Sequence, residues 1–381
     1  MNNMKTGFIC FIGCLLVLCM CSCSNREPGS FTITGEMKGL EDGIVRLYTY
    51  PPSNLLLDSC EVKDGKYSLE SKVENSQLAM LIFDINPEKY KKFIPMIRIF
   101  LEPSDIRVYN EFENPKNTQK IEGSLLNDRL VACETHIKGL PEFKQALEFS
   151  DRIQLAFHEA DMVAVRRMSK VRDSLYTLLI DQLFRFEKDA DKSEVVACLV
   201  NQYASPLSAE QVKKIIERFD PSFRSSYYVA QMEEFASKEQ ELTVGKLLPD
   251  FQVKDKDGKS YTLADFRGKY LFLEFSASWC GWCKKEIPYI RKAYDALKDK
   301  NVAFVTMMMD TEREHWLSDM EKGSIEWFCF SDLLGMKKSP MTEAYNLRGL
   351  PDSFVVDPEG YIIRKDLRGN EVLDYLSSVI N

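Results

Sequence analysis

The sequence feature that most constrains the fold is a pair of cysteines at the boundary between a buried strand and a helix. The apolar run 270–276 predicts the strand, and helical periodicity follows from residue 281 to residue 297. The motif Trp279-Cys280-Gly281-Trp282-Cys283 lies at the junction. Two cysteines three positions apart at the start of a helix can close a small disulfide ring.

The expected position of this pair favours redox chemistry. The first sulfur would be exposed and would face the positive end of the helix and its free N–H groups, which lower the pKa of a thiol. A lowered pKa improves both attack by that sulfur and its departure, and the chemistry needs no cofactor.

Two other interpretations of the cysteine pair remain open. Zinc needs four ligands, and Cys329 and His315 are the only nearby candidates in the sequence, at no recognisable spacing. We therefore expect no metal. A purely structural disulfide is disfavoured, because so short a ring constrains few residues of the unfolded chain.

The pattern around the motif predicts an α/β domain over residues 241–381. Strands and helices alternate, with a further buried strand at 302–308 and an antiparallel end formed by 353–357 and the residues after the turn Pro358-Glu359-Gly360. A closing helix covers 370–380. This alternation favours a central mixed sheet flanked by helices.

Residues 242–381 resemble the thioredoxin-fold domain of the TlpA/ResA-like thiol-disulfide oxidoreductases, within the wider redoxin/AhpC-TSA group. The residues that carry the resemblance occur in order along the chain: Gly245 with Pro249-Asp250-Phe251, Gly258-Lys259, Phe266-Arg267-Gly268-Lys269, Glu274-Phe275, the motif 279–283, Glu286 with Pro288, and Gly349-Leu350-Pro351. The resemblance implies disulfide exchange without a cofactor.

The resemblance also implies roles for single residues. Cys280 would be the attacking thiolate and Cys283 the resolving thiol, and together they would form the redox disulfide. Pro351 would be a cis-proline facing them, with the backbone of Leu350 pairing with the substrate. Asp352 stands where the family commonly has threonine, which leaves the substrate contacts and the redox potential open.

Two acids would assist the cysteines. Glu274 lies in the apolar strand, so its pKa should be raised by burial, and it could take the proton from Cys283. The alternative is an acid whose head reaches solvent at the sheet edge. Glu286 falls on the same helix face as Cys283 and would tune the thiols. A solvated helix acid is an equal alternative.

Two tryptophans are expected to contact the substrate. Trp279 would shield the disulfide, and Trp282 occupies the variable dipeptide where thioredoxin has proline. Peroxiredoxins, in the same wider group, carry Thr or Ser three residues before their reactive cysteine, where this chain has Ala277. A peroxidase and a non-catalytic envelope binding lipoprotein remain the alternatives to disulfide exchange.

Two further zones precede the α/β domain. Residues 23–123 predict a β-rich domain, in which 31–34 and 44–49 flank a Gly-bounded turn and 55–62 pairs with 66–73. This zone resembles the domain of unknown function that precedes such modules in envelope lipoproteins of Gram-negative bacteria.

Residues 124–240 predict a helical linker domain. Long charged helical patterns fill this zone, and Ser208-Ala209-Glu210-Gln211 has the form of a capping box, which predicts a helix start. We expect these helices to support or space their neighbours. A partner-binding helical surface is the alternative.

The first 22 residues predict an export signal. Lys5 opens a short positive region, and an apolar run of 14 residues follows from Phe8 to Cys21, too short for a permanent membrane anchor. Ser22 followed by Cys23 resembles a lipobox, which implies lipidation of Cys23. An ordinary cleaved signal is the alternative. Either way we expect the chain in the cell envelope, facing the periplasm.

Charge and resemblance together define the expected partners. The chain has 50 Lys and Arg against 58 Asp and Glu, a net charge of −8, which argues against nucleic acid. The resemblance implies disulfide-containing envelope proteins and an upstream membrane thiol reductant or oxidant, and the lipid would bind a membrane.

Four cysteines have no assigned role. Cys60, Cys133, Cys198 and Cys329 are scattered across all three zones. Two bridges in any of three pairings are open to them, but their scatter favours buried free thiols.

Overall fold

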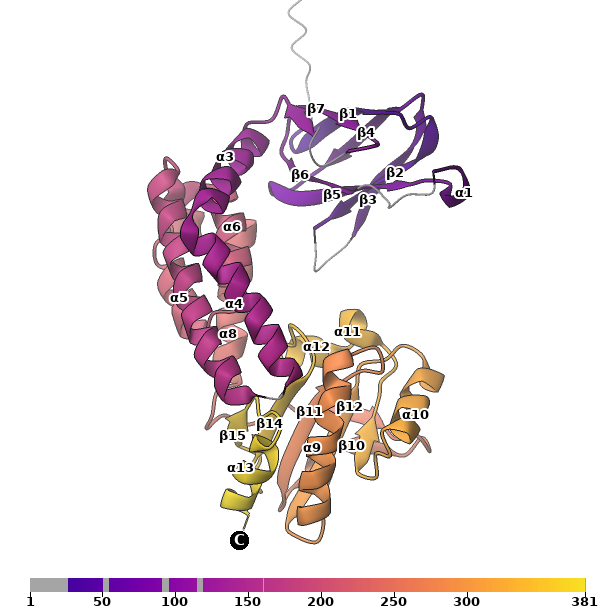
Figure 1. The fold of residues 1–381 in the computed structure, drawn as a ribbon, viewed down its shortest axis with the longest axis vertical. Coiled ribbons are helices and arrows are strands. Elements are labelled where there is room, and N and C mark those ends of the chain that lie inside the picture. The colour runs from indigo at the N-terminus through magenta and orange to yellow at the C-terminus, as the bar shows by residue number, and fades with distance from the viewer. Residues whose placement is uncertain (1–26, 51–54, 91–95, 115–118, 160, 381) are drawn as a thin grey trace, which may run out of the picture.

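The computed structural model describes residues 27–50, 55–90, 96–114, 119–159 and 161–380. The expected export signal and Cys23 lie outside these ranges. The chain forms an N-terminal sheet, a set of helices and a C-terminal α/β domain (Figure 1). Within the described ranges, no helix combines the length and hydropathy that crossing a bilayer requires.

The N-terminal part is a sheet of eight strands in the order β6-β5-β2-β3-β4-β1-β7-β8, with one short helix, α1. These elements are β1 Ser30–Lys38, β2 Asp42–Thr49, β3 Leu56–Lys63, β4 Lys66–Lys72, β5 Gln77–Asp84, α1 Pro87–Tyr90, β6 Met96–Leu101, β7 Asp105–Glu111 and β8 Lys120–Glu122. Alternate side chains of the strands, Phe31 and Ile33 of β1 among them, form one buried core. The β-rich prediction is confirmed.

Two strand pairings in this sheet differ from the expected hairpins. β1 pairs with β4 and β7, not with β2, whose two edges are taken by β3 and β5. The segment between β1 and β2 buries Leu40 in the core and carries the chain across the sheet. The turn at Asp64-Gly65 joins β3 to β4 as expected, but their ladder holds one residue pair, Lys63 with Lys66, whereas β4 pairs with β1 along its other edge.

A helical segment follows the sheet. It comprises α3 Leu125–Gly139, α4 Pro141–His158, α5 Met162–Phe186, η1 Ala190–Lys192, α6 Glu194–Ala204, α7 Ala209–Ile216, η2 Pro221–Phe223 and α8 Tyr227–Glu241. The capping box of Ser208 and Gln211 is present, so the predicted helix start is confirmed. The segment packs on the sheet, because Asn127 exchanges two hydrogen bonds with the backbone of Phe100, and the Tyr228 hydroxyl accepts one from the Leu78 N–H.

The C-terminal part is built on a five-stranded mixed sheet in the order β13-β12-β11-β14-β15. Its elements are β9 Gln252–Lys254, β10 Ser260–Thr262, η3 Leu263–Phe266, β11 Tyr270–Ser276, α9 Gly281–Leu297, β12 Val302–Met308, α10 Arg313–Lys322, β13 Phe328–Phe330, α11 Gly335–Lys338, α12 Pro340–Ala344, β14 Asp352–Val356, β15 Ile362–Lys365 and α13 Glu371–Val379. α9 and α13 bury their apolar faces on one side of the sheet, and α12 packs on the other. This is the expected thioredoxin-like arrangement.

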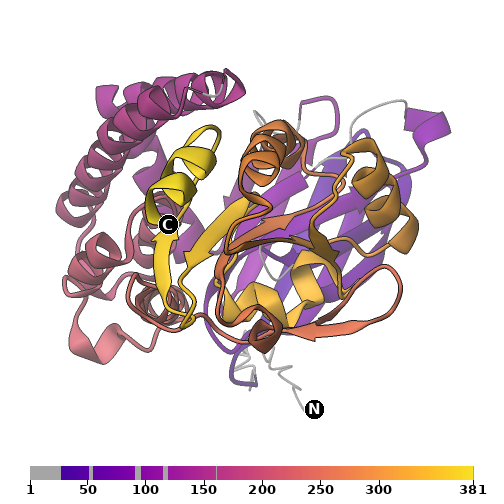
Figure 2. The same ribbon diagram turned by 90° about the horizontal axis from the view of Figure 1, so that it is seen from below.

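Helix α8 runs directly into the C-terminal domain. It ends at Glu241, and the next residue, Leu242, is 1% exposed and belongs to the core of that domain. Gly245 and Lys246 then exchange backbone hydrogen bonds with Ile362 of β15. Figure 2 shows the helical segment along one side of the C-terminal domain, next to α13.

Candidate active site

The cysteine motif lies at the carboxyl end of β11, the central strand of the C-terminal sheet. β11 is parallel to β12 and antiparallel to β14, so its end is held from both sides. The loop that follows is fixed by Asp310, which is 1% exposed and accepts hydrogen bonds from the Ser278 N–H at 3.0 Å and from its hydroxyl at 2.5 Å. Asp310 was not among the site residues predicted from the sequence. Its position directly after a buried strand was the signal that could have found it.

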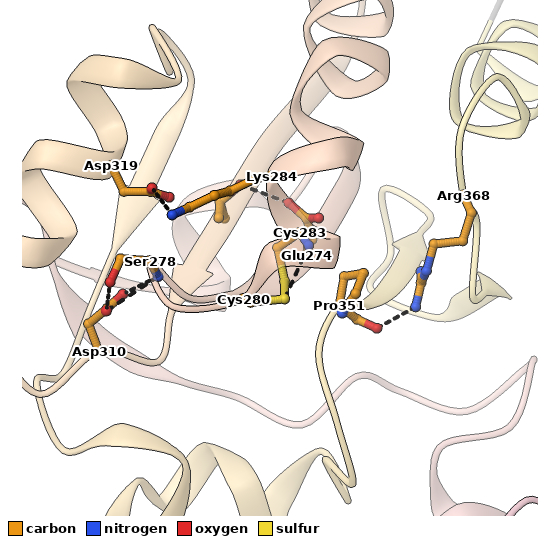
Figure 3. Close-up of a disulfide and its surroundings, with 10 residues drawn as sticks. Glu274, Ser278, Cys280, Cys283, Lys284, Asp310, Asp319, Pro351 and Arg368 are labelled. Atoms are coloured by element: carbon orange, nitrogen blue, oxygen red, sulfur yellow. Dashed lines mark hydrogen bonds and ion pairs between the residues drawn. A yellow bond between two sulfur atoms is a disulfide. The ribbon is translucent and has the colours of Figure 1, made fainter. Parts of the chain in front are cut away.

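Cys280 is the N-cap of α9, and it forms a disulfide with Cys283. The Cys283 N–H donates a hydrogen bond to the Cys280 sulfur at 3.1 Å (Figure 3). The helix therefore directs a free backbone donor at this sulfur, as its position in the sequence predicted. The expectation of an exposed first sulfur is wrong for the disulfide form: Cys280 is 5% exposed, because Trp282 and Leu350 pack against the same core.

The loop before β14 lies opposite the disulfide. The Leu350–Pro351 peptide bond is cis, as the resemblance implied, and Figure 3 shows Pro351 across from Cys280. Leu350 packs partly buried against the core that holds both cysteines. Trp279, directly before Cys280, is 63% exposed, so most of its surface is in contact with solvent. Its expected shielding of the disulfide stays a prediction.

Glu274 is buried beneath the motif. It lies in the centre of the sheet, with Thr306 and Ser353 as its strand neighbours, and it is 3% exposed. Burial raises the pKa of Glu274 to about 8, against opposing effects from Arg368 and a hydrogen bond from Thr306. In Figure 3 the carboxylate lies on the Cys283 side of the disulfide. The alternative of an acid that reaches solvent is wrong.

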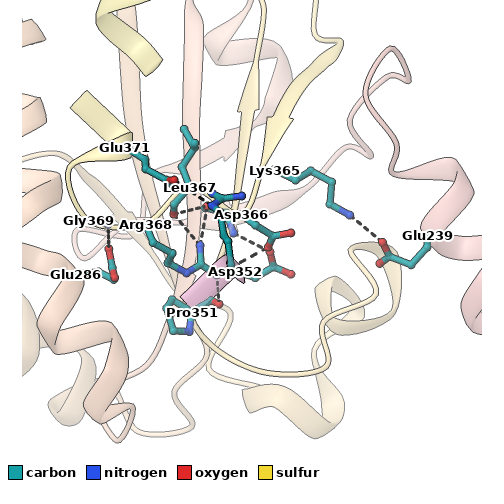
Figure 4. Close-up of polar contacts among 12 residues, drawn as sticks. Glu239, Glu286, Pro351, Asp352, Lys365, Asp366, Leu367, Arg368, Gly369 and Glu371 are labelled. Atoms are coloured by element: carbon teal, nitrogen blue, oxygen red, sulfur yellow. Dashed lines mark hydrogen bonds and ion pairs between the residues drawn. The ribbon is translucent and has the colours of Figure 1, made fainter. Parts of the chain in front are cut away.

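Glu286 is also buried, at 5% exposure on the face of α9 that carries Cys283. Its carboxylate accepts a hydrogen bond of 2.7 Å from the Gly369 N–H, just before α13 (Figure 4). Burial raises the pKa of Glu286, and the Gly369 bond and the Arg368 charge partly offset this. The solvated-acid alternative is therefore wrong.

Arg368 connects these groups, although it was not among the site residues predicted from the sequence. Its guanidinium is buried and donates to the carbonyl of Pro351 at 2.5 Å and to the hydroxyl of Ser353 at 2.9 Å (Figure 4). Its positive charge lowers the pKa of Glu274 and of Glu286. A single arginine beside a glycine after the last strand carries no sequence pattern that would mark it.

We expect Arg368→Met to move the pH dependence of activity upward by about one to three pH units, because an opposite charge lowers the pKa of a neighbouring carboxyl by that amount. Arg368→Lys keeps the charge and should keep the pH profile, although it loses the two-pronged contact to Pro351 and Ser353. The measurement is the rate of insulin disulfide reduction across pH. Identical profiles for Met and Lys would show that Arg368 acts through packing alone.

The residue after the cis-proline also has a raised pKa. Burial and the nearby Asp366 raise the pKa of Asp352 to about 7, while Arg368 and Lys365 oppose the shift. Lys365 in turn pairs with Glu239 of α8 at 3.0 Å (Figure 4). A chain of charges thus runs from the helical segment to the loop that faces the disulfide.

The remaining described cysteines stay apart from the motif. Cys133, Cys198 and Cys329 are buried free thiols and Cys60 is a half-buried one, which confirms the expectation for these four. Burial raises the pKa of the Cys329 thiol to about 12. In the part of the chain that the structure describes, no group of three or more His, Cys, Asp or Glu side chains is arranged to hold a metal ion.

Comparisons with known proteins cover two of the three parts. A family model described as Redoxin matches residues 243–377, and one described as Domain of unknown function (DUF4369) matches residues 31–130. The chain is 30% identical over 146 residues to the thiol-disulfide oxidoreductase ResA of Bacillus cereus, which covers 38% of this chain and 82% of that protein.

Two further comparisons give similar values. ResA of Bacillus subtilis is 31% identical over 130 residues, which is 34% of this chain and 70% of that protein. The crystal structure of the thioredoxin domain of a thiol-disulfide oxidoreductase from Bacteroides vulgatus is 33% identical, with 36% of this chain and 99% of that chain covered and a TM-score of 0.35.

Proposed function

Because the chain belongs to the family of ResA-type thiol-disulfide oxidoreductases, we propose that its Cys280–Cys283 pair exchanges disulfides with proteins of the cell envelope. The observation that carries this proposal is the arrangement at the end of β11. A disulfide starts a helix, a buried acid lies beneath it, and a cis-proline loop faces it. Each element supplies one requirement of the exchange.

The first step is attack by the reduced pair. The thiolate of Cys280 attacks one sulfur of a substrate disulfide, the substrate S–S bond breaks, and the other substrate sulfur leaves as a thiolate that takes up a proton. The backbone N–H of Cys283, which donates to the Cys280 sulfur, stabilises negative charge on it. The product is a mixed disulfide between Cys280 and the substrate.

The second step is resolution by Cys283. The Glu274 carboxylate takes the proton of the Cys283 thiol, and the resulting thiolate attacks the Cys280 sulfur and releases the reduced substrate. Two electrons have then passed to the substrate, and the Cys280–Cys283 disulfide is left behind. A pKa of about 8 suits Glu274 to this task, because the group can both accept and return the proton near neutral pH. Run backwards, the same steps oxidise a substrate.

The proposed location rests on the amino-terminal sequence. The short positive region, the apolar run and Ser22-Cys23 support export and lipidation of Cys23. The protein would then be held at a membrane, facing the periplasm, where an upstream membrane thiol reductant or oxidant renews the pair. The redox balance requires such a partner, since each turnover changes the state of the dithiol.

Cys283→Ala in cells that express the full chain tests both parts of the proposal. This variant cannot resolve the mixed disulfide, so envelope proteins should accumulate covalently joined to Cys280 and be released by dithiothreitol. The adducts should partition into the detergent phase of a Triton X-114 extraction. Adding Cys23→Ser should move them to the aqueous phase.

The double variant Cys280→Ala with Cys283→Ala is the matched control and should trap nothing. If the single variant also traps nothing, exchange with proteins is wrong. Adducts made only with cytoplasmic proteins would contradict export and leave the exchange chemistry standing.

A further inference from the structure

The helical segment contacts the cysteine motif itself. Phe157, at the end of α4, packs edge-to-face on Trp282 with the ring centroids 4.9 Å apart and the planes at 88°. The Lys285 ammonium lies 5.0 Å from the centroid of the same Trp282 ring. The tryptophan between the two cysteines is thus positioned both by its own helix and by a residue from another part of the chain.

A second contact fixes this end of the helical segment beside the motif. The Arg166 guanidinium of α5 donates two hydrogen bonds to the Glu371 carboxylate, at 3.0 and 2.5 Å. Met162 of α5 lies close to Gly369, since a Cβ atom on this glycine would come within 3.9 Å of the Met162 side chain. Gly369 is also the residue whose N–H binds Glu286. The α4–α5 hairpin therefore sits on the loop that holds the buried acid of α9.

The same helical segment also reaches the loop of the cis-proline. The Arg348 guanidinium lies 3.3 Å from the ring centroid of Phe235 in α8 and donates to the carbonyl of Ser205. The Asn346 amide donates to the carboxylate of Glu239 at 2.9 Å. Both residues precede Pro351 by only a few positions. Helices thus contact the surroundings of the disulfide on the Trp282 side and on the cis-proline side.

Trp279 marks the open side. It is 63% exposed, whereas Cys280 is 5% exposed and Trp282 is partly buried. A large partner cannot approach the Cys280 sulfur past Phe157 and Trp282 without displacing the α4–α5 hairpin. The approach that the hairpin leaves uncovered is on the side of the exposed Trp279.

We propose that the α4–α5 hairpin is a wall of the active site and that Phe157 is a specificity-determining residue. The wall excludes disulfides embedded in broad folded surfaces. It admits disulfides on narrow, extended segments, which enter along Trp279 and can align with the backbone of Leu350 in the manner of an added strand. This inference rests on the disulfide exchange proposed above.

The wall can be tested without enzymatic turnover by comparing how fast a small and a large reagent modify Cys280. In the reduced Cys283→Ala protein, alkylation of Cys280 is followed by peptide mass spectrometry with N-ethylmaleimide and with a maleimide joined to polyethylene glycol. Phe157→Ala should raise the rate of the polymer reagent relative to the small one by about three- to tenfold, the range that corresponds to the free energy of one aromatic pair.

Phe149→Ala is the matched control. It makes the same change two turns earlier on α4, where the ring contacts Arg152 of its own helix, and it should leave the ratio unchanged. Equal acceleration of both reagents by Phe157→Ala, or none, overturns the proposal.

Exchanging the charges of Arg166 and Glu371 distinguishes a true wall effect from a general folding defect. Arg166→Glu should loosen the hairpin and raise the same ratio, and adding Glu371→Arg should restore it, because the ion pair is rebuilt in reverse. Failure of the double variant to restore the ratio contradicts the proposal.

Turnover gives a second readout. Phe157→Ala should raise kcat/KM for folded insulin relative to oxidised glutathione by a similar factor. A fall in both values by the same factor would mean that Phe157 merely supports Trp282, and the proposal would be wrong. Alkylation of Cys280 does not require disulfide exchange. The alkylation ratio would therefore still test the wall if the proposed function were wrong.

Discussion

Replacing Cys280 by Ser reduces insulin disulfide reduction to the background rate of the reductant alone, an expected loss of at least about a thousandfold. Serine keeps the size and the helix N-cap position but cannot form the thiolate that the Cys283 N–H stabilises. The measurement is the turbidity of precipitating insulin B chain with the reductant held constant.

Cys60→Ser is the matched control for this prediction. It makes the same atomic change at a half-buried free thiol of β3 and should retain full activity. If Cys280→Ser and the wild type react equally fast, the disulfide in this structure is not the reactive one.

The second large effect is expected from Glu274→Gln. The amide has nearly the same shape but cannot take the proton of Cys283, and loss of a general base lowers a rate by about a hundredfold or more. Decay of the mixed disulfide, followed by acid quench, should show this loss directly. Wild-type decay should rise with pH and level off above about 8, where Glu274 is ionised, while the variant should show no plateau there.

The same variant should become more stable than the wild type as the pH rises. Below pH 4.5 Glu274 holds its proton in both the folded and the unfolded chain, and the acid contributes no pH dependence. Between pH 4.5 and about 8 the unfolded chain loses the proton and the folded chain keeps it. The free energy of unfolding should therefore fall by about 1.4 kcal/mol per pH unit in the wild type relative to the variant.

Denaturant unfolding of the disulfide form at several pH values measures this difference, with the exposed Glu359→Gln as the control. A variant that loses activity without gaining stability would show that Glu274 supports the fold and does not accept the proton of Cys283. A variant that gains stability and keeps full activity would remove Glu274 from the resolving step.

The local pattern of the C-terminal domain was sufficient to predict the parallel strands β11 and β12, helix α9, the β14–β15 hairpin and the closing helix α13, but not β13, α10, α11 or α12. β11 and α9 have the bounds that the apolar run and the helical periodicity indicated. The burial of Glu274 followed because one acid in a wholly apolar strand cannot reach water from the centre of a sheet. These features depend on residues that are close together in the sequence, so the local pattern of this chain was enough to predict them.

The features that the sequence did not predict depend on contacts between distant residues. The predicted pairing of β1 with β2 was wrong, because strand periodicity indicates which face of a strand is buried but not which strand lies next to it. Arg368 contacts Pro351, 17 positions away in the sequence, and a lone arginine looks the same in the sequence whether it is solvated or buried. Phe157 and Trp282 meet across two parts of the chain, and no spacing rule connects them.

The direct passage of α8 into the C-terminal core determines how the dithiol meets its partners. A catalytic domain on a flexible tether searches a volume, and its effective concentration at a target follows from the length of that tether. Here Leu242 is buried one residue after α8 ends, so these residues provide no such tether. The helical segment contacts both the N-terminal sheet and the C-terminal domain, so these contacts, and not the length of a linker, determine where the reactive pair lies relative to the sheet.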